Sequence, residues 1–468
     1  MKIYFVGIGG IGVSALAKYY LEKGYKVSGS DLLSSEITKS LEKQGAKIFI
    51  GKHKPRSVLG TVDLVIYSPA VPKDNPELKE TRKLGIKCQS YPQALGELTK
   101  KYFTIAIAGT HGKSTVTAMT GLLLKKAGLD PTVIVGTKLK EFQNSNYRAG
   151  KSEYLVIEAD EHMASFLNYW PKIIVLTNIE KEHLDYYKNL KQILKTYKNY
   201  VNHLPKNGFL IANKDDKNIL QLTRNKKQKT VFFSIKQKGA KNLKKILKIP
   251  GEHNVSNALA ALTTARVLKI PDKISFNSLS EYRGSWRRFE IKKSTINGKK
   301  TTIISDFAHH PTEIKSTFEA VREKFGERKI WCVYQPHQYQ RTYYLFKDFV
   351  KVFKEALRET QGKPLVDSLI ITDIYDVVGR EEKKIKERVN SKKLVEAINK
   401  NRAIYPHTKR GQSRLKSGKI DEVSPRYGVG VYIKKEAIIN YLKRNLRGGE
   451  VVIIMGAGDI YELVDSFK

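Results

Sequence analysis

The chain has 468 residues, too many for one ordinary hydrophobic core, and at about 150 residues per domain we expect three domains. Hydrophobic residues make up 41% and fall in short runs broken by glycine or proline, which argues against a disordered or membrane-spanning chain. Lysine and arginine exceed aspartate and glutamate by 85 to 46, so nucleic acid has to be considered as a partner. The basic residues are spread along the chain, and a solvated lysine-rich face explains the acid-free stretch 217–248. We therefore expect anionic small ligands and no nucleic acid.

The first 17 residues resemble a secretory signal, with a lysine, an apolar run and a small-residue ending. We reject that interpretation because four of these residues are glycines in a phosphate-loop spacing and a charged amphipathic stretch follows. Cys88 and Cys332 are too few for a disulfide framework and fit a reducing compartment. The sequence thus predicts a cytoplasmic protein without membrane insertion.

Short apolar runs alternate with amphipathic segments from end to end, which is the pattern of βαβ units that build mostly parallel sheets. The predicted fold class is α/β. We place domain boundaries near residue 100, before a new strand, and near residue 284, after a helical segment and a turn. The expected domains are 1–100, 101–284 and 285–468.

The first glycine-rich loop lies between a predicted strand, Lys2–Val6, and a helix, and comprises Gly7, Ile8, Gly9, Gly10, Ile11 and Gly12. Asp31 ends the next predicted strand. In this Rossmann-type layout the glycines let the backbone approach a diphosphate at the helix N-terminus, and the acid can bind a ribose hydroxyl. A dinucleotide and a UDP-sugar both carry such a diphosphate, and a tight turn without a ligand is the alternative.

Another predicted strand of this region ends at Ser68, which would place a polar group in the crevice where open α/β sheets bind ligands. Asn75 and Pro76 follow it. They suit the same crevice, and they suit equally well the N-cap and first position of a helix.

The second glycine-rich loop follows a predicted strand, Phe103–Ala108, and reads Gly109, Thr110, His111, Gly112, Lys113, Ser114 and Thr115 before a helix. In a phosphate loop the backbone amides cradle the phosphates, the lysine reaches the β- and γ-oxygens and the serine hydroxyl can bind Mg²⁺. The strict Walker A motif has a glycine where this chain has Ile107, so a shorter GTxGK[ST] loop is indicated. We expect ATP here.

Acidic and imidazole groups follow the next two predicted strands: Glu158, Asp160 and Glu161 after one, and Glu180, Glu182, His183 and Asp185 after the other. The ends of parallel strands lie on the same rim as the phosphate loop, so these groups are candidates to hold Mg²⁺, which prefers carboxylates, phosphate oxygens and water. For His183 alone, a surface histidine is an equally good interpretation.

The third region begins with a turn and an alanine-rich helix that carries Asn254 and Asn257 near its start. An asparagine amide suits adenine, and helix capping by Asn254 is the alternative. Asp306, followed by His309 and His310, ends a later predicted strand, and Arg341 follows another. The paired histidines lack the helical spacing of a zinc protease, so zinc is not expected there.

Nine motifs occur in one order across nearly the whole chain: GIGGIG, GTHGKST, EADE, TNIE, PGEHNVSNALAA, RRFE, DFAHHPTEI, YQPHQYQRT and GAGDI. Together they resemble the Mur ligases. The resemblance implies an N-terminal Rossmann-like domain for a UDP-sugar, a central P-loop ATPase with a mostly parallel sheet, and a C-terminal Rossmann-like domain. DFAHHPTEI and YQPHQYQRT look most like the L-alanine-adding member, whose substrates are ATP, UDP-N-acetylmuramate and L-alanine, with Mg²⁺.

By that resemblance ATP phosphorylates the muramyl carboxylate, and the amine of L-alanine attacks the acyl phosphate. The resemblance also assigns roles to residues. It places Lys113 at the transferred phosphoryl group and gives Mg²⁺ to Ser114, Glu158 and His183. It implies that ATP is bound by the loop residues 109–115 with Asn257, Arg288 and Asp306. It places His309 and Arg341 at the amino acid or the reacting carboxylate. The residues that it implies for the UDP-sugar are Gly9, Gly10, Ile11, Gly12, Asp31 and Ser68.

The chain departs from the family pattern at His162-Met163, where Ser-Asp is typical, and at Ser305, where aspartate is more usual. The basic segment 375–432 looks longer than typical, and a solvated insertion explains it. Three alternatives remain open: a recycling ligase that adds a preformed peptide, an NAD-dependent dehydrogenase and a nucleic-acid-binding P-loop protein. We expect a monomer or a weak homodimer.

Overall fold

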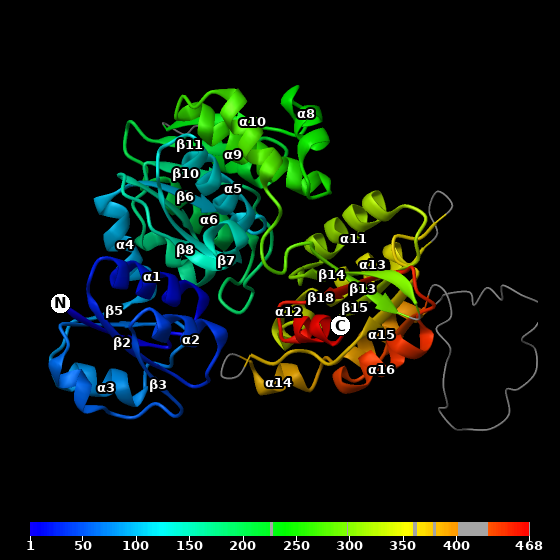
Figure 1. Ribbon diagram of the computed structural model, residues 1–468, viewed down its shortest axis with the longest axis horizontal. Helices are drawn as coiled ribbons and strands as arrows, with labels where there is room; N and C mark the ends of the chain where they lie inside the picture. The colour runs from blue at the N-terminus through cyan, green and yellow to red at the C-terminus, as the bar shows by residue number, and fades with distance from the viewer. Residues whose placement is uncertain (225–227, 297, 359–362, 378–380, 401–428, 468) are drawn as a thin grey trace, which may run out of the picture. The chain divides into compact units, whose positions relative to one another are not determined.

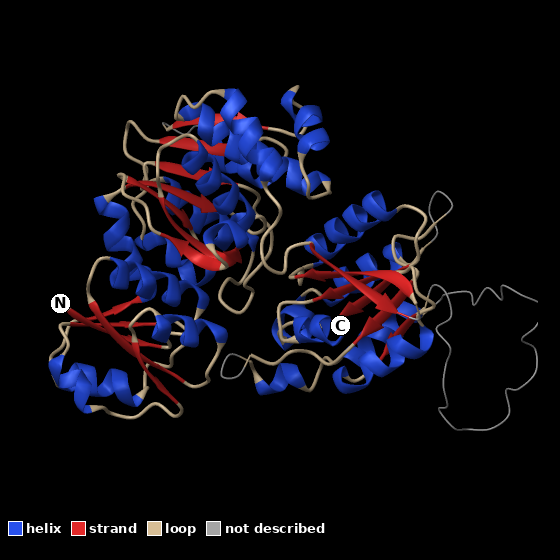
Figure 2. Cartoon of the chain, in the orientation of Figure 1, coloured by secondary structure: helices blue, strands red, loops and turns tan. Residues whose placement is uncertain are grey.

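A computed structural model describes residues 1–224, 228–296, 298–358, 363–377, 381–400 and 429–467. The chain forms two compact units, one made of residues Met1–Ile249 and His253–Trp286, the other of Pro250–Glu252 and Arg287–Lys468. Much of the basic segment 375–432 lies outside the described residues. Three sheets, each flanked by helices, make up the described chain (Figure 2).

The first sheet has the strand order β3-β2-β1-β4-β5, and every pairing in it is parallel. This order is that of a Rossmann fold up to its fifth strand, so the predicted Rossmann-like domain is confirmed. Its strands are β1 (Lys2–Val6), β2 (Lys26–Asp31), β3 (Lys47–Ile50), β4 (Leu64–Tyr67) and β5 (Cys88–Ser90). Its helices are α1 (Ile11–Glu22), α2 (Glu36–Lys43), η1 (Ser57–Thr61), α3 (Pro76–Lys83) and α4 (Tyr91–Lys101) (Figure 1).

The second sheet belongs to the same unit and has the order β12-β11-β10-β6-β9-β7-β8, with only the β7–β8 edge pair antiparallel. Its strands are β6 (Phe103–Ala108), β7 (Thr132–Leu139), β8 (Ser145–Arg148), β9 (Tyr154–Glu158), β10 (Ile173–Leu176), β11 (Phe209–Asn213) and β12 (Lys229–Phe233). Its helices are α5 (Lys113–Lys126), η2 (Lys140–Phe142), η3 (His162–Asn168), α6 (Leu190–Val201), α7 (Lys217–Thr223), α8 (Gly239–Ile246), α9 (Glu252–Val267) and α10 (Asp272–Glu281).

The central strand β6 is buried on both faces. Because successive side chains of a strand point to opposite sides, its alternate residues pack into two different clusters. Ile105 and Ile107 pack into one apolar cluster with α5 and α9, whereas Ala106 and Ala108 pack into another that reaches the first sheet. This two-sided burial explains the uninterrupted apolar run and fixes the carboxyl end of β6 firmly. The loop that follows β6 is thereby held on a rigid support.

The third sheet makes up the other unit and has the order β13-β14-β18-β15-β16-β17, with only the β13–β14 edge pair antiparallel. Its strands are β13 (Glu290–Ile296), β14 (Lys299–Asp306), β15 (Ile330–Tyr334), β16 (Ser368–Ile371), β17 (Gly430–Tyr432) and β18 (Val451–Met455). Its helices are α11 (Pro311–Phe325), α12 (Tyr339–Tyr344), α13 (Phe346–Ala356), α14 (Lys383–Lys386), α15 (Ser391–Asn399), α16 (Lys435–Asn445) and η4 (Ile460–Phe467). The predicted α/β class with mostly parallel sheets is confirmed.

Two ambiguous segments of the sequence are resolved by the helices. Asn75 caps α3, because its side chain accepts hydrogen bonds from the amides of Glu77 and Leu78 and Pro76 begins the helix. Asn254 does not cap α9, since that helix begins at Glu252 and buries Asn254 within its first turn. The capping interpretation of Asn254 was therefore wrong.

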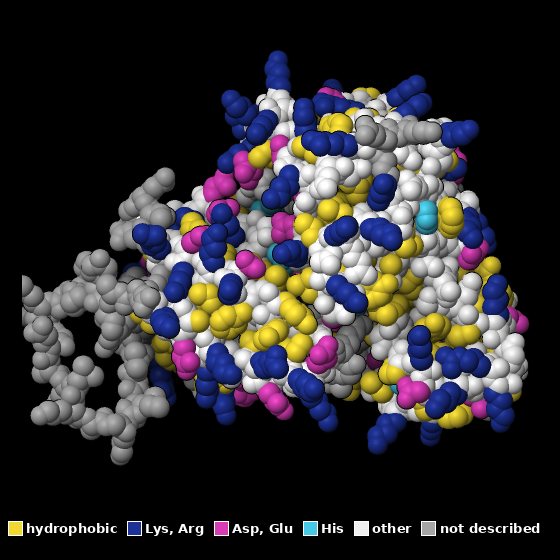
Figure 3. Space-filling model, turned by 180° about the vertical axis from the view of Figure 1, so that it is seen from behind, with side chains coloured by type: hydrophobic (Ala, Val, Ile, Leu, Met, Phe, Trp, Pro, Cys, Tyr) yellow, Lys and Arg dark blue, Asp and Glu magenta, His cyan; other side chains and the backbone are white. Residues whose placement is uncertain are grey.

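On the face drawn in Figure 3, lysine and arginine side chains are scattered among apolar and acidic ones and do not gather into one stripe. Among the described residues, every helix is too short or too polar to cross a membrane. Both cysteines are free thiols, Cys332 buried and Cys88 partly so.

Candidate functional site

The phosphate loop predicted from the sequence joins the end of β6 to the first residue of α5. Gly109 has φ 140° and Gly112 has φ 81°, and both positions leave no room for a side chain. A Cβ at Gly109 would lie 2.0 Å from Thr177 Oγ1, and one at Gly112 would lie 2.4 Å from Asn257 Oδ1. The two glycines are therefore required by the path of the loop and by its neighbours.

The loop is held from the end of β10. The amide of Thr110 donates to the carbonyl of Asn178 at 2.9 Å, and the amide of His111 donates to Asn178 Oδ1 at 2.7 Å. The hydroxyl of Thr177 donates to the carbonyl of His111 at 2.6 Å, and the amide of Glu180 donates to Thr110 Oγ1 at 2.8 Å. Thr177 and Asn178 thus shape a loop that lies some 70 residues earlier in the sequence.

Lys113, the first residue of α5, is surrounded by oxygen atoms. Its Nζ donates to the carbonyls of Gly109 and Thr110 at 2.7 and 3.2 Å and to Glu161 Oε2 at 2.9 Å. Burial alone would lower the pKa of Lys113, but Glu161, Asp160 and Glu158 outweigh it and raise that pKa. The ammonium therefore stays charged at the mouth of the loop, as the handling of phosphate requires.

Ser114 and Glu158 form the second polar pair of the loop. The hydroxyl of Ser114 donates to Glu158 Oε1 at 3.0 Å, while the amide of Gly136 donates to Glu158 Oε2 at 2.8 Å. Mg²⁺ prefers oxygen ligands, so the Ser114 hydroxyl and the Glu158 carboxylate can bind it together with phosphate oxygens. The residues present fit that ion. Thr115, the third residue of α5, is buried.

The structure groups His183 with Lys113 through Asp160 and Glu161, the two acids that follow β9. His183 Nε2 lies 3.6 Å from Glu161 Oε1 and 3.9 Å from Asp160 Oδ1. Burial lowers the pKa of His183 to about 4, so its ring is neutral near pH 7, the form that binds metals. His183 thus lies beside the same two acids as Lys113, whereas Ser114 and Glu158 contact each other directly.

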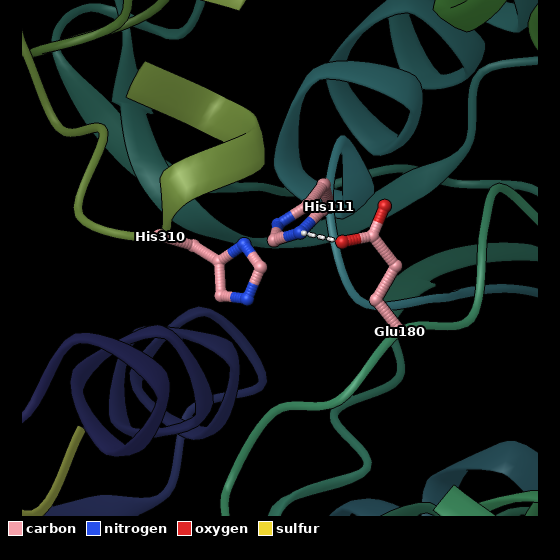
Figure 4. Close-up of side chains that lie close together, drawn as sticks. All are labelled: His111, Glu180 and His310. Carbon is pink, nitrogen blue, oxygen red and sulfur yellow. Dashed lines mark ion pairs between the residues drawn. The ribbon is translucent and has the colours of Figure 1, made fainter. Parts of the chain in front are cut away.

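His111 and Glu180 point toward one another across the loop (Figure 4), with His111 Nε2 3.6 Å from Glu180 Oε2. Asn257, predicted to contact adenine, is buried on α9 beside Gly112, and its amide nitrogen is 3.5 Å from Asn254 Oδ1. Its contact is thus with the glycine that directly precedes α5. The residues predicted to bind ATP in this unit, 109–115 and Asn257, are brought together.

The first glycine-rich loop closes on Asp31. The amide of Gly9 donates to Asp31 Oδ2 at 2.8 Å, and a Cβ at Gly9 would lie 2.9 Å from the same oxygen. Gly10 directly precedes α1 and Ile11 begins it, so the loop and the helix N-terminus meet as predicted. Gly12 packs on the ring of Tyr91, which a Cβ would approach to 2.8 Å.

Ser68 lies at the end of β4, beside the same loop. A Cβ at Gly7 would lie 3.1 Å from Ser68 Cβ, and one at Gly10 would lie 4.0 Å from Ser68 Oγ. The Ser68 hydroxyl accepts from the amide of Ala70 at 3.3 Å. The six residues predicted to bind the UDP-sugar therefore cluster at one edge of the first sheet.

In the other unit, Asp306 ends β14 and is held by three donors: the amides of Phe289 and Ala308 at 2.8 and 2.9 Å and the hydroxyl of Thr317 at 3.2 Å. Burial raises the pKa of Asp306. The guanidinium of Arg288 lies 5.3 Å from the ring centre of Phe307, next to Asp306. Arg288 and Asp306 are thus brought together.

The neighbouring Arg287 is buried and plays a different part. Its guanidinium donates to the carbonyls of Gly456 and Gly458, so it binds the last glycine-rich loop to the start of β13. Burial lowers the pKa of Arg287 to about 10. Of the two adjacent arginines, Arg287 binds the backbone carbonyls of Gly456 and Gly458, whereas the guanidinium of Arg288 lies near the ring of Phe307.

His309 and Arg341 meet through a residue that the prediction left out. Arg341 Nη1 lies 3.0 Å from His337 Nδ1 and donates to the His337 carbonyl at 3.0 Å. The rings of His337 and His309 are 5.9 Å apart, and His309 Nδ1 lies 3.3 Å from Glu313 Oε2. His310, at the start of α11 (Figure 4), accepts from the amide of Thr312 and caps that helix.

Two important residues of the site received no individual role from the sequence. Glu161 is the partner of Lys113, with its side chain 3% exposed, and Asn178 shapes the loop. Both lie inside strand-end stretches that were singled out as a whole. The only signal in the sequence was their position just after a strand. Side chains no longer alternate regularly between the two faces there, so the sequence does not show which of Asp160 and Glu161 contacts Lys113.

Comparisons with known proteins place the chain in a family. Three profiles match in succession: "Mur ligase family, catalytic domain" over residues 2–103, "Mur ligase middle domain" over 107–265, and "Mur ligase, glutamate ligase domain" over 287–458. The chain is 40% identical to the UDP-N-acetylmuramate--L-alanine ligase of Clostridium acetobutylicum, covering 100% of this chain and 97% of that protein. It is 35% identical to the enzyme of the same name from Aquifex aeolicus, with the same coverage.

Solved structures agree with the sequence matches. The UDP-N-acetylmuramate-alanine ligase of Thermotoga maritima aligns with a TM-score of 0.74 and 25% identity over 100% of this chain and 98% of that one. A murein peptide ligase from Psychrobacter arcticus aligns with a TM-score of 0.69 at 22% identity, over the same shares of the two chains, which shows a shared fold alone. With profiles matched from residue 2 to 458 and relatives aligned over the full length, the chain belongs to the Mur ligase family.

Proposed function

We propose that the chain joins L-alanine to the carboxylate of UDP-N-acetylmuramate at the expense of ATP, in the synthesis of peptidoglycan precursors. The observation that carries this proposal is the phosphate loop in which Lys113 contacts Glu161 and Ser114 contacts Glu158, in a chain 35–40% identical to ligases of this activity over its full length. ATP is then the nucleotide of this loop, and the loop closed by Asp31 holds the diphosphate of the UDP-sugar.

The reaction needs activation because a free carboxylate is a poor electrophile. A carboxylate oxygen of the muramyl group attacks the γ-phosphorus of ATP, the bond to the β-phosphate oxygen breaks, and ADP leaves. The amine of L-alanine then adds to the carbonyl carbon of the acyl phosphate. Loss of a proton from nitrogen and of phosphate from carbon gives the amide. Such a sequence depends chiefly on positioning and charge neutralisation.

The residues of the phosphate loop supply that neutralisation. The ammonium of Lys113 stabilises the negative charge that moves between the phosphate oxygens. Ser114 and Glu158, with His183 nearby, would hold Mg²⁺, which when bound neutralises phosphate charge. The backbone of residues 109–112 cradles the phosphates at the N-terminus of α5. Asn257 is a further proposed ATP-binding residue of this unit, and Arg288 and Asp306 of the other unit are proposed to bind ATP as well.

The remaining assignments concern the two other substrates. Gly9, Gly10, Ile11 and Gly12 bring backbone amides to the UDP diphosphate, Asp31 and Ser68 take polar groups of the same molecule, and His309 and Arg341 face L-alanine or the reacting carboxylate. Arg341 is suited to a carboxylate because a guanidinium offers two parallel donors.

Several broader expectations remain part of the proposal. They are a cytoplasmic monomer or weak homodimer, with domains 1–100, 101–284 and 285–468. The recycling ligase that adds a preformed peptide is the alternative within the family. A dehydrogenase or a nucleic-acid-binding protein would leave one of the two glycine-rich loops without a ligand.

The experiment measures phosphate release and product mass after incubation with UDP-N-acetylmuramate, ATP, Mg²⁺ and one amino acid or peptide at a time. We expect turnover that requires both the UDP-sugar and L-alanine, and product mass equal to their condensation. Turnover with the tripeptide L-alanyl-γ-D-glutamyl-meso-diaminopimelate and none with L-alanine would select the recycling ligase. Phosphate release that does not depend on the UDP-sugar would refute both the L-alanine-adding and the recycling ligase.

One pair of variants tests the UDP-sugar loop separately. Gly9→Ala places a methyl group against Asp31, so we expect the KM for UDP-N-acetylmuramate to rise at least about tenfold while the KM for ATP is little changed. Gly60→Ala is the control, because a Cβ there meets nothing within 4 Å. An equal rise in the KM for ATP would contradict the assignment of this loop.

A further inference from the structure

Tyr91 lies beside the first glycine-rich loop, and the proposed reaction assigns it no part. It is the first residue of α4, the helix that follows β5 and contacts α1 (Figure 1). A Cβ at Gly12 would lie 2.8 Å from Tyr91 Cζ and 2.9 Å from the hydroxyl oxygen of Tyr91. The phenol end of the ring therefore lies against the first turn of α1, because Gly12 is the second residue of that helix.

Helix α4 is held firmly against the segment that follows β9. A Cβ at Gly96 would lie 2.4 Å from the carbonyl oxygen of Asn168, the last residue of η3, so the two backbones are in close contact. The hydroxyl oxygen of Thr99 accepts a hydrogen bond from the amide of Trp170 at 2.9 Å. These contacts fix α4, and with it Tyr91, relative to the central sheet.

The hydroxyl of Tyr91 is available as a hydrogen-bond donor. Burial raises the pKa of Tyr91, and the negative charges of Glu158 and Asp160 raise it further, so the phenol stays protonated at neutral pH. The side chain is partly buried, and within the described parts of the chain its hydroxyl forms no hydrogen bond. A donor that is already oriented by the fold thus lies at the start of α1.

The position of this hydroxyl indicates which group it binds. The first amides of a helix have no partner within the helix and point toward an anion at its N-terminus, so a diphosphate there lies next to Gly12. We propose that the hydroxyl of Tyr91 donates a hydrogen bond to the diphosphate of the UDP-sugar. This inference rests on the proposed function and adds a side-chain donor to a loop that otherwise offers backbone amides.

The test measures the binding of UDP and of UDP-N-acetylmuramate to the full-length protein by isothermal titration calorimetry, without ATP or L-alanine. Tyr91→Phe removes the hydroxyl and keeps the ring that packs on Gly12. We expect the Kd of each ligand to rise at least about tenfold, as for the loss of a hydrogen bond to a charged acceptor. The factor should be the same for both ligands, because both carry the diphosphate.

Tyr25→Phe is the matched control. Tyr25 and Tyr91 are both partly buried and pack against the same apolar cluster, but Tyr25 precedes β2 and so lies at the amino end of the parallel strands, away from the loop. We expect this variant to bind both ligands as the unaltered chain does. Unchanged affinity of Tyr91→Phe for UDP would overturn the proposal, and so would a loss confined to UDP-N-acetylmuramate, which would place the contact on the sugar.

Steady-state kinetics separate a contact with the ligand from a structural role. Tyr91→Phe should raise the KM for UDP-N-acetylmuramate at least about tenfold and keep kcat and the KM for ATP within about twofold. An equal rise in the KM for ATP, or a lower midpoint of thermal unfolding without ligands, would show a structural role and overturn the proposal. If the unaltered chain bound neither UDP ligand, the proposed function itself would fail. If it bound both and ligated L-alanine, and Tyr91→Phe did so equally well, only the role of Tyr91 would be wrong.

Discussion

Replacing Lys113 by methionine tests the central claim about the phosphate loop, because it removes a charge and keeps the length of the side chain. The Nζ atom contacts Glu161 at 2.9 Å, and the two side chains are 12% and 3% exposed. The loss of one group that stabilises transition-state charge lowers kcat roughly 100- to 1000-fold, about 3–4 kcal/mol. We expect Lys113→Met to lose at least that much ligase turnover, with UDP-sugar binding retained.

The same change costs stability by an amount that can be bounded. Without the ammonium, the buried carboxyl of Glu161 takes up a proton. Burial already raises the pKa of Glu161 to about 7 beside Lys113, so the unaltered chain bears part of this cost. Full protonation of a carboxyl of ordinary pKa near 4.3 at pH 7 costs about 3.7 kcal/mol, which is therefore an upper bound on the loss. Lys113→Met should therefore lower the midpoint of thermal unfolding by at most about 6 °C at pH 7, because a unit of this size unfolds with an entropy of roughly 0.6 kcal/mol per kelvin, and by much less at pH 5.

The control lies on the same helix. Lys126 contacts Glu281 at the same 2.9 Å, but the two side chains are 41% and 56% exposed, so Lys126→Met should cost at most about 1 kcal/mol and leave turnover unchanged. Adding Glu161→Gln to Lys113→Met should restore most of the stability and none of the turnover. Recovery of turnover in that double variant, or turnover of Lys113→Met within fivefold of the unaltered chain, would refute the assigned role.

Two further predictions concern a glycine and a buried lysine. Gly112→Ala should reduce ATP turnover at least about tenfold, because its methyl group meets Asn257. Gly128→Ala is the control: Gly128 has a similar φ of 78° but open space around it, so this change should cost about 1 kcal/mol of stability and leave turnover unchanged. Equal turnover in the two variants would contradict this prediction. Burial and the nearby charge of Lys138 lower the pKa of Lys18 from 10.5 to about 8. Below pH 8 the buried ammonium destabilises the folded chain; between pH 8 and 10.5 the folded chain loses this proton while the unfolded chain keeps it, so stability rises with pH. The free energy of unfolding from denaturant titrations should therefore rise over pH 8–9.5 relative to that of Lys18→Met, by on the order of 3 kcal/mol at most, and parallel curves would exclude the effect.

The sequence by itself determined the local parts of this protein. Glycines at positions of left-handed backbone, such as Gly112, and a lysine-serine pair at a helix start define a phosphate loop, because these features depend only on neighbours in the chain. Alternating apolar runs likewise predicted the strands, the α/β class and the groups at the strand ends. Family membership followed from many such local motifs in one order.

Only the tertiary structure decided which of several adjacent residues does the work. Asp160 and Glu161 are neighbours in sequence, yet Glu161 is buried against Lys113 while Asp160 is 55% exposed. Arg287 rather than Arg288 binds the carbonyls of the last glycine-rich loop. The pairing of His162 with Asp185 joins segments that follow different strands. Contacts of this kind depend on which side chain points into the interior and on which strands are neighbours in the sheet. The spacing of residues along the sequence shows neither.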